Sequence, residues 1–200
     1  MNGRYPRFAV ALLVSVGVGC TSAPVRYYTL TSPPAKTLPV SQTAFAIDVR
    51  VVHTPPQLQR SELMVRNGPT EMTLLENERW ASLPKDEIKD AVRLELQRRL
   101  SDATGLRPFT KLTLDIDVQN FEAELGKYAL LDVSWSATLF APGAQSGGGR
   151  TTTCTFRADE RIHAGYAGLV EGYQRDIAAL AEAVVAVLTS SANGIDASCH

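Results

Sequence analysis

The segment KLTLDIDVQNFEAELGKYALLDVSWSATLF, residues 111–140, decides the fold of this 200-residue chain. Apolar side chains occupy alternate positions on both sides of Gly126: Leu112, Leu114, Ile116 and Val118 before it, and Leu131, Val133, Trp135, Ala137 and Leu139 after it. The positions between the first four are polar. A period of two is typical of strands with one buried face. The segment therefore predicts two antiparallel strands in a sheet that is covered on one side.

A third strand follows the glycine-rich loop PGAQSGGG, residues 142–149. In TTTCTFRA, residues 151–158, the side chains of Cys154, Phe156 and Ala158 share one face, which extends the pair to a three-stranded meander. The loop glycines lack the Lys-Ser/Thr pair of a P-loop and precede a strand. They predict a hairpin tip and not a phosphate-binding loop.

Shorter strands are predicted upstream of this meander. Residues 45–52 place Phe45, Ile47, Val49 and Val51 on one face, which is the pattern of a half-buried strand. Residues 62–66 and 70–75 flank the turn-forming sequence Asn67-Gly68-Pro69 and predict a hairpin.

Two amphipathic helices complete the pattern. The first begins near Pro84, which suits the first helical turn, with Asp86 and Glu87 where the helix dipole favours acids. Its apolar stripe consists of Ile88, Ala91, Val92, Leu94, Leu96 and Leu100. The second covers about 167–189, with the stripe Leu169, Tyr173, Ile177, Leu180, Val184 and Leu188. The chain therefore predicts an α+β fold: a two-layer sandwich in which a largely antiparallel sheet of about six strands is covered on one face by two helices.

The amino-terminal residues MNGRYPRFAVALLVSVGVGC have the layout of a lipoprotein signal peptide. Arg4 and Arg7 precede an apolar run, and small residues then lead to Cys20. The run, residues 8–18, is well short of the roughly 20 residues that span a bilayer. We expect cleavage before Cys20 and lipidation of that cysteine by diacylglycerol and a fatty acid such as palmitate. The alternatives are an ordinary secretory signal with an incidental cysteine and a retained membrane anchor.

Sorting and domain limits follow from the lipidated cysteine. Thr21 stands where Asp would favour inner-membrane retention, so the expected location is the inner leaflet of the outer membrane, facing the periplasm. Residues 1–19 are expected to be the signal peptide, 20–43 a lipid-anchored segment with a proline-rich linker, 44–192 one α+β domain, and 193–200 a polar tail. The linker, with its three prolines, is expected to act as a spacer between lipid and domain. Tyr27, Tyr28 and Leu30 are expected to dock as a short strand.

Composition excludes some partners. Loss of Arg4 and Arg7 with the signal leaves 18 basic and 21 acidic side chains, a net charge of −3. Such a chain lacks the excess of positive charge that nucleic-acid binding needs. With Cys20 lipidated, Cys154 and Cys199 remain, and in an oxidising compartment they predict a disulfide. The alternative is a buried free Cys154 and an unpaired Cys199.

The residues offer no catalytic constellation. His53, His163 and His200 stand in no catalytic setting, no serine lies in a G-x-S-x-G motif, and no Cys/His spacing fits zinc. Asp115 and Asp117 are predicted to face solvent on the sheet. We therefore expect neither enzymatic activity nor a cofactor or metal.

Aromatic side chains are the remaining candidates for interaction. Trp135 is predicted to lie in the core. Trp80 is either core packing or a surface anchor, and together with Tyr27 and Tyr28 it forms the candidate partner interface.

The ordered motifs of the chain resemble those of the ABC-type transport auxiliary lipoprotein family, the group that includes the paraquat-inducible PqiC (YmbA) lipoproteins. The motifs are the cysteine followed by Tyr27-Tyr28-x-Leu30, then ENERWASLPKDEI around Trp80, VQNFEAE at 118–124, and GYAGLVEGYQRDIAALAEAV at 165–184. The likeness spans nearly all of the chain after Cys20.

The resemblance implies a non-enzymatic accessory protein of an envelope transport system. Its expected partners are a periplasm-spanning mammalian-cell-entry (MCE) type protein, the inner-membrane permease and the ATPase, and its expected role is lipid movement between membranes. A lipoprotein that itself carries lipid or solute in apolar space between helices and sheet is the alternative, and an envelope hydrolase is a third. Oligomeric state, including a homo-oligomer, is left open.

Overall fold

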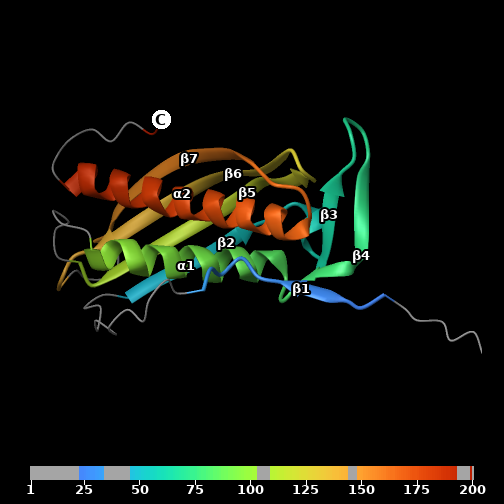
Figure 1. Ribbon diagram of the computed structural model, residues 1–200. Coiled ribbons are helices and arrows are strands. Elements are labelled where there is room, and N and C mark those ends of the chain that lie inside the picture. Colours follow the sequence, from blue (N-terminus) through green and yellow to red (C-terminus); the bar gives the residue numbers. More distant parts are fainter. Residues whose placement is uncertain (1–22, 34–45, 103–108, 144–147, 193–198, 200) are drawn as a thin grey trace, which may run out of the picture.

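The computed structural model describes residues 23–33, 46–102, 109–143, 148–192 and 199. Within these ranges lie seven strands and two α-helices (Figure 1). In chain order they are β1 (Arg26–Tyr28), β2 (Ala46–His53), a 3₁₀ turn (Pro56–Leu58), β3 (Glu62–Arg66), β4 (Met72–Trp80), α1 (Pro84–Asp102), β5 (Lys111–Glu124), β6 (Tyr128–Phe140), β7 (Arg150–Arg161) and α2 (Tyr166–Ala192). The α+β class predicted from the sequence is confirmed.

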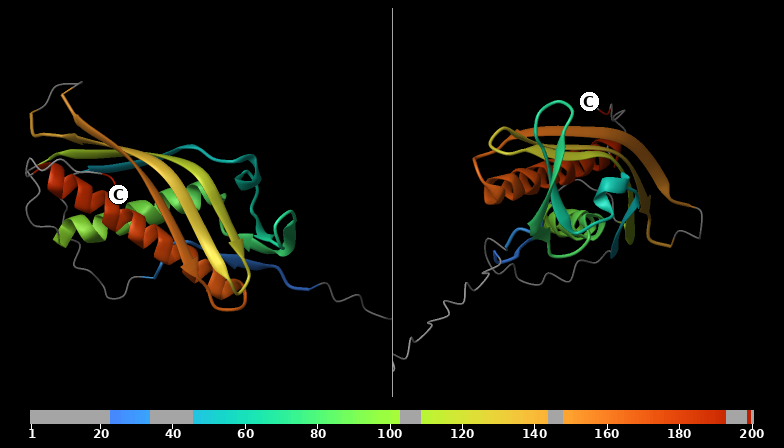
Figure 2. Two further views of the ribbon diagram at one scale, coloured as in Figure 1. Left: turned by 90° about the horizontal axis from the view of Figure 1, so that it is seen from above. Right: turned by 90° about the vertical axis from the view of Figure 1, so that its right-hand side faces the viewer.

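The larger sheet has the strand order β2-β5-β6-β7. The three long strands form the predicted antiparallel meander, and β2 pairs in parallel with β5. Both helices lie against one face of this sheet, which curves over them (Figures 1 and 2). The alternating apolar residues of the opening segment point toward the helices and are buried, among them Leu112, Leu114, Ile116, Val133 and Trp135.

The helices bury the stripes that their spacing predicts. Ile88, Val92 and Leu96 of α1 are fully inaccessible, as are Leu180 and Val184 of α2. The two helices run in the same direction, and both begin at the end of the molecule that carries β1, β3 and β4 (Figure 1).

The smaller sheet has the order β1-β4-β3. Strands β3 and β4 form the predicted hairpin, whose turn contains Gly68 at φ +87°, a conformation that favours glycine. The register shifts between Glu62 and Leu63, so β3 pairs with both the first half of β4 and Arg79 in its second half. The end of β4, Glu78 to Trp80, also pairs in parallel with β1. Strand β4 therefore extends five residues beyond the predicted end at residue 75 and includes Trp80.

The strands form two sheets where the sequence predicts one, because β1, β3 and β4 pair with one another and not with the meander. In the chain, β1 comes before the proline-rich segment, which lies between β1 and β2.

Candidate functional site

Strand β1 brings the predicted tyrosine pair to the start of both helices. Successive side chains of a strand point to opposite faces, and here Tyr27 is exposed whereas Tyr28 is half-buried against β4. Leu30, just after the strand, is almost completely buried in the core. The expectation that this segment docks as a short strand is confirmed. Cys20, the expected lipidation site, lies outside the described residues.

Glu78 of β4 holds β1 from the inside. Its buried carboxylate accepts hydrogen bonds from both Nε and Nη2 of Arg26, with Nε 3.0 Å from each oxygen. The hydroxyl of Tyr28 donates to the same carboxylate at 2.7 Å. The guanidinium of Arg26 also lies over the ring of Tyr166 at the start of α2, 5.7 Å from its centroid. One acidic side chain therefore joins β1 to β4, and Arg26 joins both to α2.

Burial and hydrogen bonding together set the pKa values in this cluster. Burial raises the pKa of Glu78, but the hydrogen bonds from Arg26 and Tyr28 outweigh it, so the pKa lies below that of an ordinary glutamate. Burial, followed by the hydrogen bond to the Glu78 carboxylate, raises the pKa of Tyr28 to about 12. At neutral pH, Glu78 is ionised and Tyr28 is protonated, which is the pairing that the hydrogen bond needs.

A second buried carboxylate, Glu87 of α1, holds the residues that follow β1. It accepts the backbone amide of Leu30 at 2.9 Å and the hydroxyl of Thr29 at 2.8 Å. It also accepts the backbone amide and hydroxyl of Ser82 in the turn before the helix. The sequence indicates Glu87 only as an acid near a helix N-terminus. Its bonds to Thr29 and Leu30, more than 50 residues away, are the part that local pattern cannot predict.

The aromatic residues form a cluster where the small sheet meets α2. The rings of Phe121 and Tyr173 stack with centroids 3.9 Å apart, and the Trp80 ring lies 6.0 and 6.1 Å from them. Trp80 is only 4% exposed, so its ring packs in the core and is not available at the surface. A small pocket of about 20 Å³ lies beside the cluster, under the β3–β4 hairpin. That volume accepts about one water molecule and is far too small for an acyl chain.

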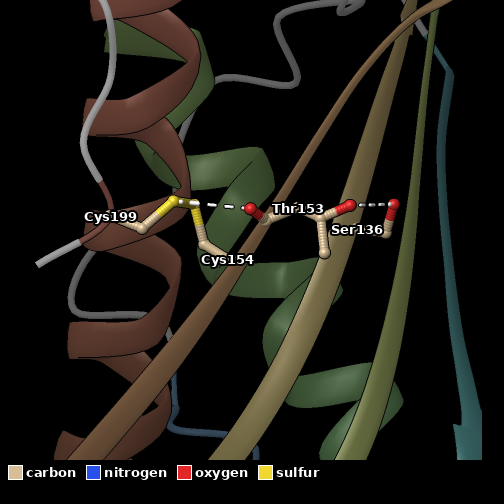
Figure 3. Close-up of a disulfide and its surroundings, with 4 residues drawn as sticks. All are labelled: Ser136, Thr153, Cys154 and Cys199. Carbon is tan, nitrogen blue, oxygen red and sulfur yellow. Dashed lines mark hydrogen bonds between the residues drawn. A yellow bond between two sulfur atoms is a disulfide. The ribbon is translucent and has the colours of Figure 1, made fainter.

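The two remaining cysteines are brought together at the other sheet. Cys154 of β7 is buried on the helix side, and the structure joins it to Cys199 by a disulfide with the Cα atoms 5.5 Å apart (Figure 3). The neighbouring Thr153 points to the opposite side, where its hydroxyl donates to Ser136 of β6. The bridge attaches Cys199 to the edge strand of the sheet.

Of the residues considered for catalysis, His53 and Asp117 are register partners on the paired strands β2 and β5, whereas His163 lies near the start of α2. His53 ends β2 and His163 precedes α2, both exposed, and His200 lies outside the described residues. Asp115 pairs with Arg50 across β2 and β5 in a bidentate contact of 2.6 and 2.7 Å. No cluster of three or more His, Cys, Asp or Glu side chains suited to a metal occurs among the described residues.

Sequence reasoning misses Asp176, which lies fully buried on α2. Neither carboxylate oxygen has a hydrogen-bond partner within the described part of the chain. Burial, and then the negative charges of Glu160 and Asp159 on β7, raise the pKa of Asp176 to about 8, against the opposing charge of Arg175. The available signal is its spacing, because Asp176 falls three residues after Tyr173 inside the apolar stripe.

None of the helices in the described ranges combines the length and apolarity needed to cross a bilayer.

Comparison with known proteins points to one family. The model of the family described as "ABC-type transport auxiliary lipoprotein component" matches residues 28–185. No curated protein sequence matches the chain. The fold is similar to the crystal structure of an uncharacterised protein, at 15% identity and a TM-score of 0.63, over 82% of this chain and 98% of that one. It is also similar to that of a Xanthomonas campestris protein, at 18% identity and a TM-score of 0.55, over 84% and 98% of the two chains. At these identities, the two structures support the fold alone.

Proposed function

Because the chain belongs to the ABC-type transport auxiliary lipoprotein family, we propose that it is an outer-membrane adaptor for an ABC/MCE-type transport system. Lipid on Cys20 anchors it in the inner leaflet, and the domain faces the periplasm. There it binds the MCE-type protein that connects it with the inner-membrane permease and ATPase. The system moves lipids or other apolar solutes across the envelope. Membership of a lipoprotein family supports the envelope location.

The docking of β1 is the observation that carries this proposal. Four residues separate Cys20 from Val25, and β1 begins at the next position, Arg26. The strand is held by the buried carboxylate of Glu78, and the residues after it are held by that of Glu87. A pull on the anchor therefore acts directly on the folded domain and not on a long linker. This arrangement suits a protein that holds a fixed position at a membrane while a partner docks.

Packing favours the adaptor over the cargo carrier. The layer between the helices and the large sheet is filled by fully buried side chains such as Leu114, Ile116, Leu180 and Val184. The pocket beside Trp80 has room for about one water molecule. Native mass spectrometry of envelope-extracted protein separates the two roles. An adaptor is expected without bound lipid beyond its own anchor, whereas a stoichiometric lipid in the delipidated domain would favour the carrier.

Anchoring and partner binding are tested separately. Cys20→Ala should release the protein from membranes into the periplasmic fraction, and unchanged membrane association would contradict the lipid anchor. The full-length acylated protein, solubilised in detergent, should retain the MCE-type protein that is encoded beside it in a pull-down. The soluble Cys20→Ala variant should also bind it if the domain makes the contact. Absence of binding in both forms would contradict the adaptor role.

A further inference from the structure

We propose that Val25, Tyr27 and Leu83 form a patch that rests on the bilayer surface carrying the lipid of Cys20. This inference rests on the proposed lipid anchor. It goes further by assigning a second, non-covalent membrane contact to named side chains of the domain. The occupant is the headgroup region of a phospholipid bilayer and not another protein.

The distribution of exposed apolar side chains supports this surface. Within the described residues, five large apolar side chains are exposed: Val25, Tyr27, Val52, Leu74 and Leu83. Val25 and Tyr27 lie just before and within β1. Leu83 lies in the turn after β4, the strand that pairs with β1. Three of the five therefore flank or belong to the paired strands β1 and β4, Val25 and Tyr27 at the start of β1 and Leu83 just beyond the end of β4. Val52 on β2 and Leu74 in the β3–β4 hairpin lie elsewhere.

The patch stands on a fixed backbone. Arg26 and Tyr28 bond Glu78 on one side of β1, and strand alternation then directs Tyr27 to the other side. The carbonyl of Leu83 accepts the amides of Asp86 and Glu87 in the first turn of α1. Leu83 is flanked by Ser82, which is bonded to Glu87, and by the buried Pro84. The side chain of Leu83 is exposed on a backbone held by these bonds, so little backbone freedom is lost when a surface covers it.

The length of the chain before the patch selects the bilayer as the occupant. Five residues from Cys20 to Val25 span at most about 18 Å when fully extended. The headgroup region of one leaflet is itself about 5–8 Å thick. A lipidated Cys20 therefore keeps Val25 and Tyr27 within a short distance of the membrane in every conformation of the tether. The phenol ring suits this position, because tyrosine is enriched at membrane interfaces, where its ring is apolar and its hydroxyl is wet.

Single tryptophan probes in the acylated full-length protein test the contact. The native indoles of Trp80 and Trp135 are buried and give a constant background. Tyr27→Trp and Leu83→Trp report on the patch. Val52→Trp and Leu74→Trp are matched controls, because their positions are 62% and 37% exposed, against 67% and 44% for Tyr27 and Leu83. Each variant is reconstituted in vesicles of phosphatidylethanolamine and phosphatidylglycerol, with and without lipids brominated high on the acyl chain, and vesicle binding is verified by flotation.

The proposal predicts about a twofold loss of the added emission at positions 27 and 83 with brominated lipid, and little loss at 52 and 74. Protein that floats with the vesicles but shows equal quenching at all four positions, or none at 27 and 83, overturns the patch while leaving the anchor intact. Acrylamide, a quencher dissolved in the water, gives a second measurement. If the tryptophans at 27 and 83 are shielded from acrylamide but are not quenched by brominated lipid, a second copy or a partner protein covers these positions. That result also overturns the membrane patch. Failure to float removes the anchor, and the patch with it.

Discussion

The two sheets of this domain share one apolar core but differ in their polar contacts. The large sheet and its helices are joined by apolar packing, in which side chains such as Leu114 and Leu180 have no accessible surface. The small sheet contributes Leu63 and Trp80 to the same core. Its strand β1, which is only three residues long, is attached in addition by the buried carboxylates of Glu78 and Glu87.

Leu180→Ala removes apolar packing under the large sheet and should have the largest effect on stability. Its side chain is completely buried between α2 and the large sheet, so truncation removes contacts and leaves a cavity. We expect a loss of about 2–5 kcal/mol in the free energy of unfolding. Urea denaturation measures it, with the exposed Val52→Ala as control. A loss below about 1 kcal/mol would mean that this layer is not a packed core.

The disulfide adds a covalent constraint to the large sheet, through Cys154 of β7. The bridge closes a loop of 45 residues between Cys154 and Cys199. Removal of the bridge by Cys199→Ser should lower the free energy of unfolding by about 2–4 kcal/mol, because the unfolded chain gains conformational entropy. Titration of free thiols in the unfolded, unreduced protein verifies the bridge first. Two reactive thiols in the mature chain would contradict it.

Glu78→Gln tests the polar contacts that attach β1 to β4. The amide leaves Arg26 without its buried counter-charge and removes one acceptor from the cluster, for an expected loss of about 1–2 kcal/mol. Glu76→Gln, on the same strand but exposed, is the control and should be nearly neutral.

The pH dependence of this cluster has a definite sign. The pKa of Glu78 is lowered in the folded protein, so its contribution is present above the pKa of an ordinary glutamate and is lost as pH falls through the lowered value. Acid should therefore weaken the wild type more than Glu78→Gln in denaturation series at decreasing pH. Parallel acid profiles for the two proteins would contradict the role of the carboxylate.

Asp176→Asn is expected to have the smallest effect, and it should stabilise. The pKa of Asp176 is raised to about 8, so the folded state retains a proton that the unfolded state loses near the ordinary value of 3.8. Stability is therefore lost between about pH 4 and pH 8. The asparagine variant lacks this loss, but its buried amide would have no partner among the described residues, which offsets most of the gain. The net increase in the free energy of unfolding at pH 8 should therefore be on the order of 1 kcal/mol. Identical slopes against pH for the variant and the wild type would contradict the raised pKa.

Local periodicity accounts for most of the fold. The alternation in β5 and the stripes of α1 and α2 predict which residues are buried, because each element must cover one apolar face. The parallel pairing of β1 with β4 and of β2 with β5 has no local signal, since each joins strands that are distant in the chain. Trp80 shows the limit at a single residue: its position before a helix left core and surface open, and only the packing against Phe121 and Tyr173 decides between them.

The candidate site is predicted less completely than the fold. Tyr27 and Tyr28 are evident as residues heavier than a tether needs, but their opposite roles depend on the register of β1 against Glu78. In the sequence, Glu78 and Glu87 cannot be distinguished from the other acidic residues of a charged stretch. Their importance comes from partners more than 50 residues away, which spacing along the chain cannot reveal.

Hydrogen exchange of the Leu30 amide tests the central claim most directly, namely that the segment next to the proposed lipid anchor is an integral part of the domain. This amide donates to the buried carboxylate of Glu87 at 2.9 Å. In the full-length acylated protein, its protection should be comparable to that of the amides of β4, and it should fall in Glu87→Gln. Exchange at the rate of an unstructured peptide would show that the segment is a free tether, and would contradict the account.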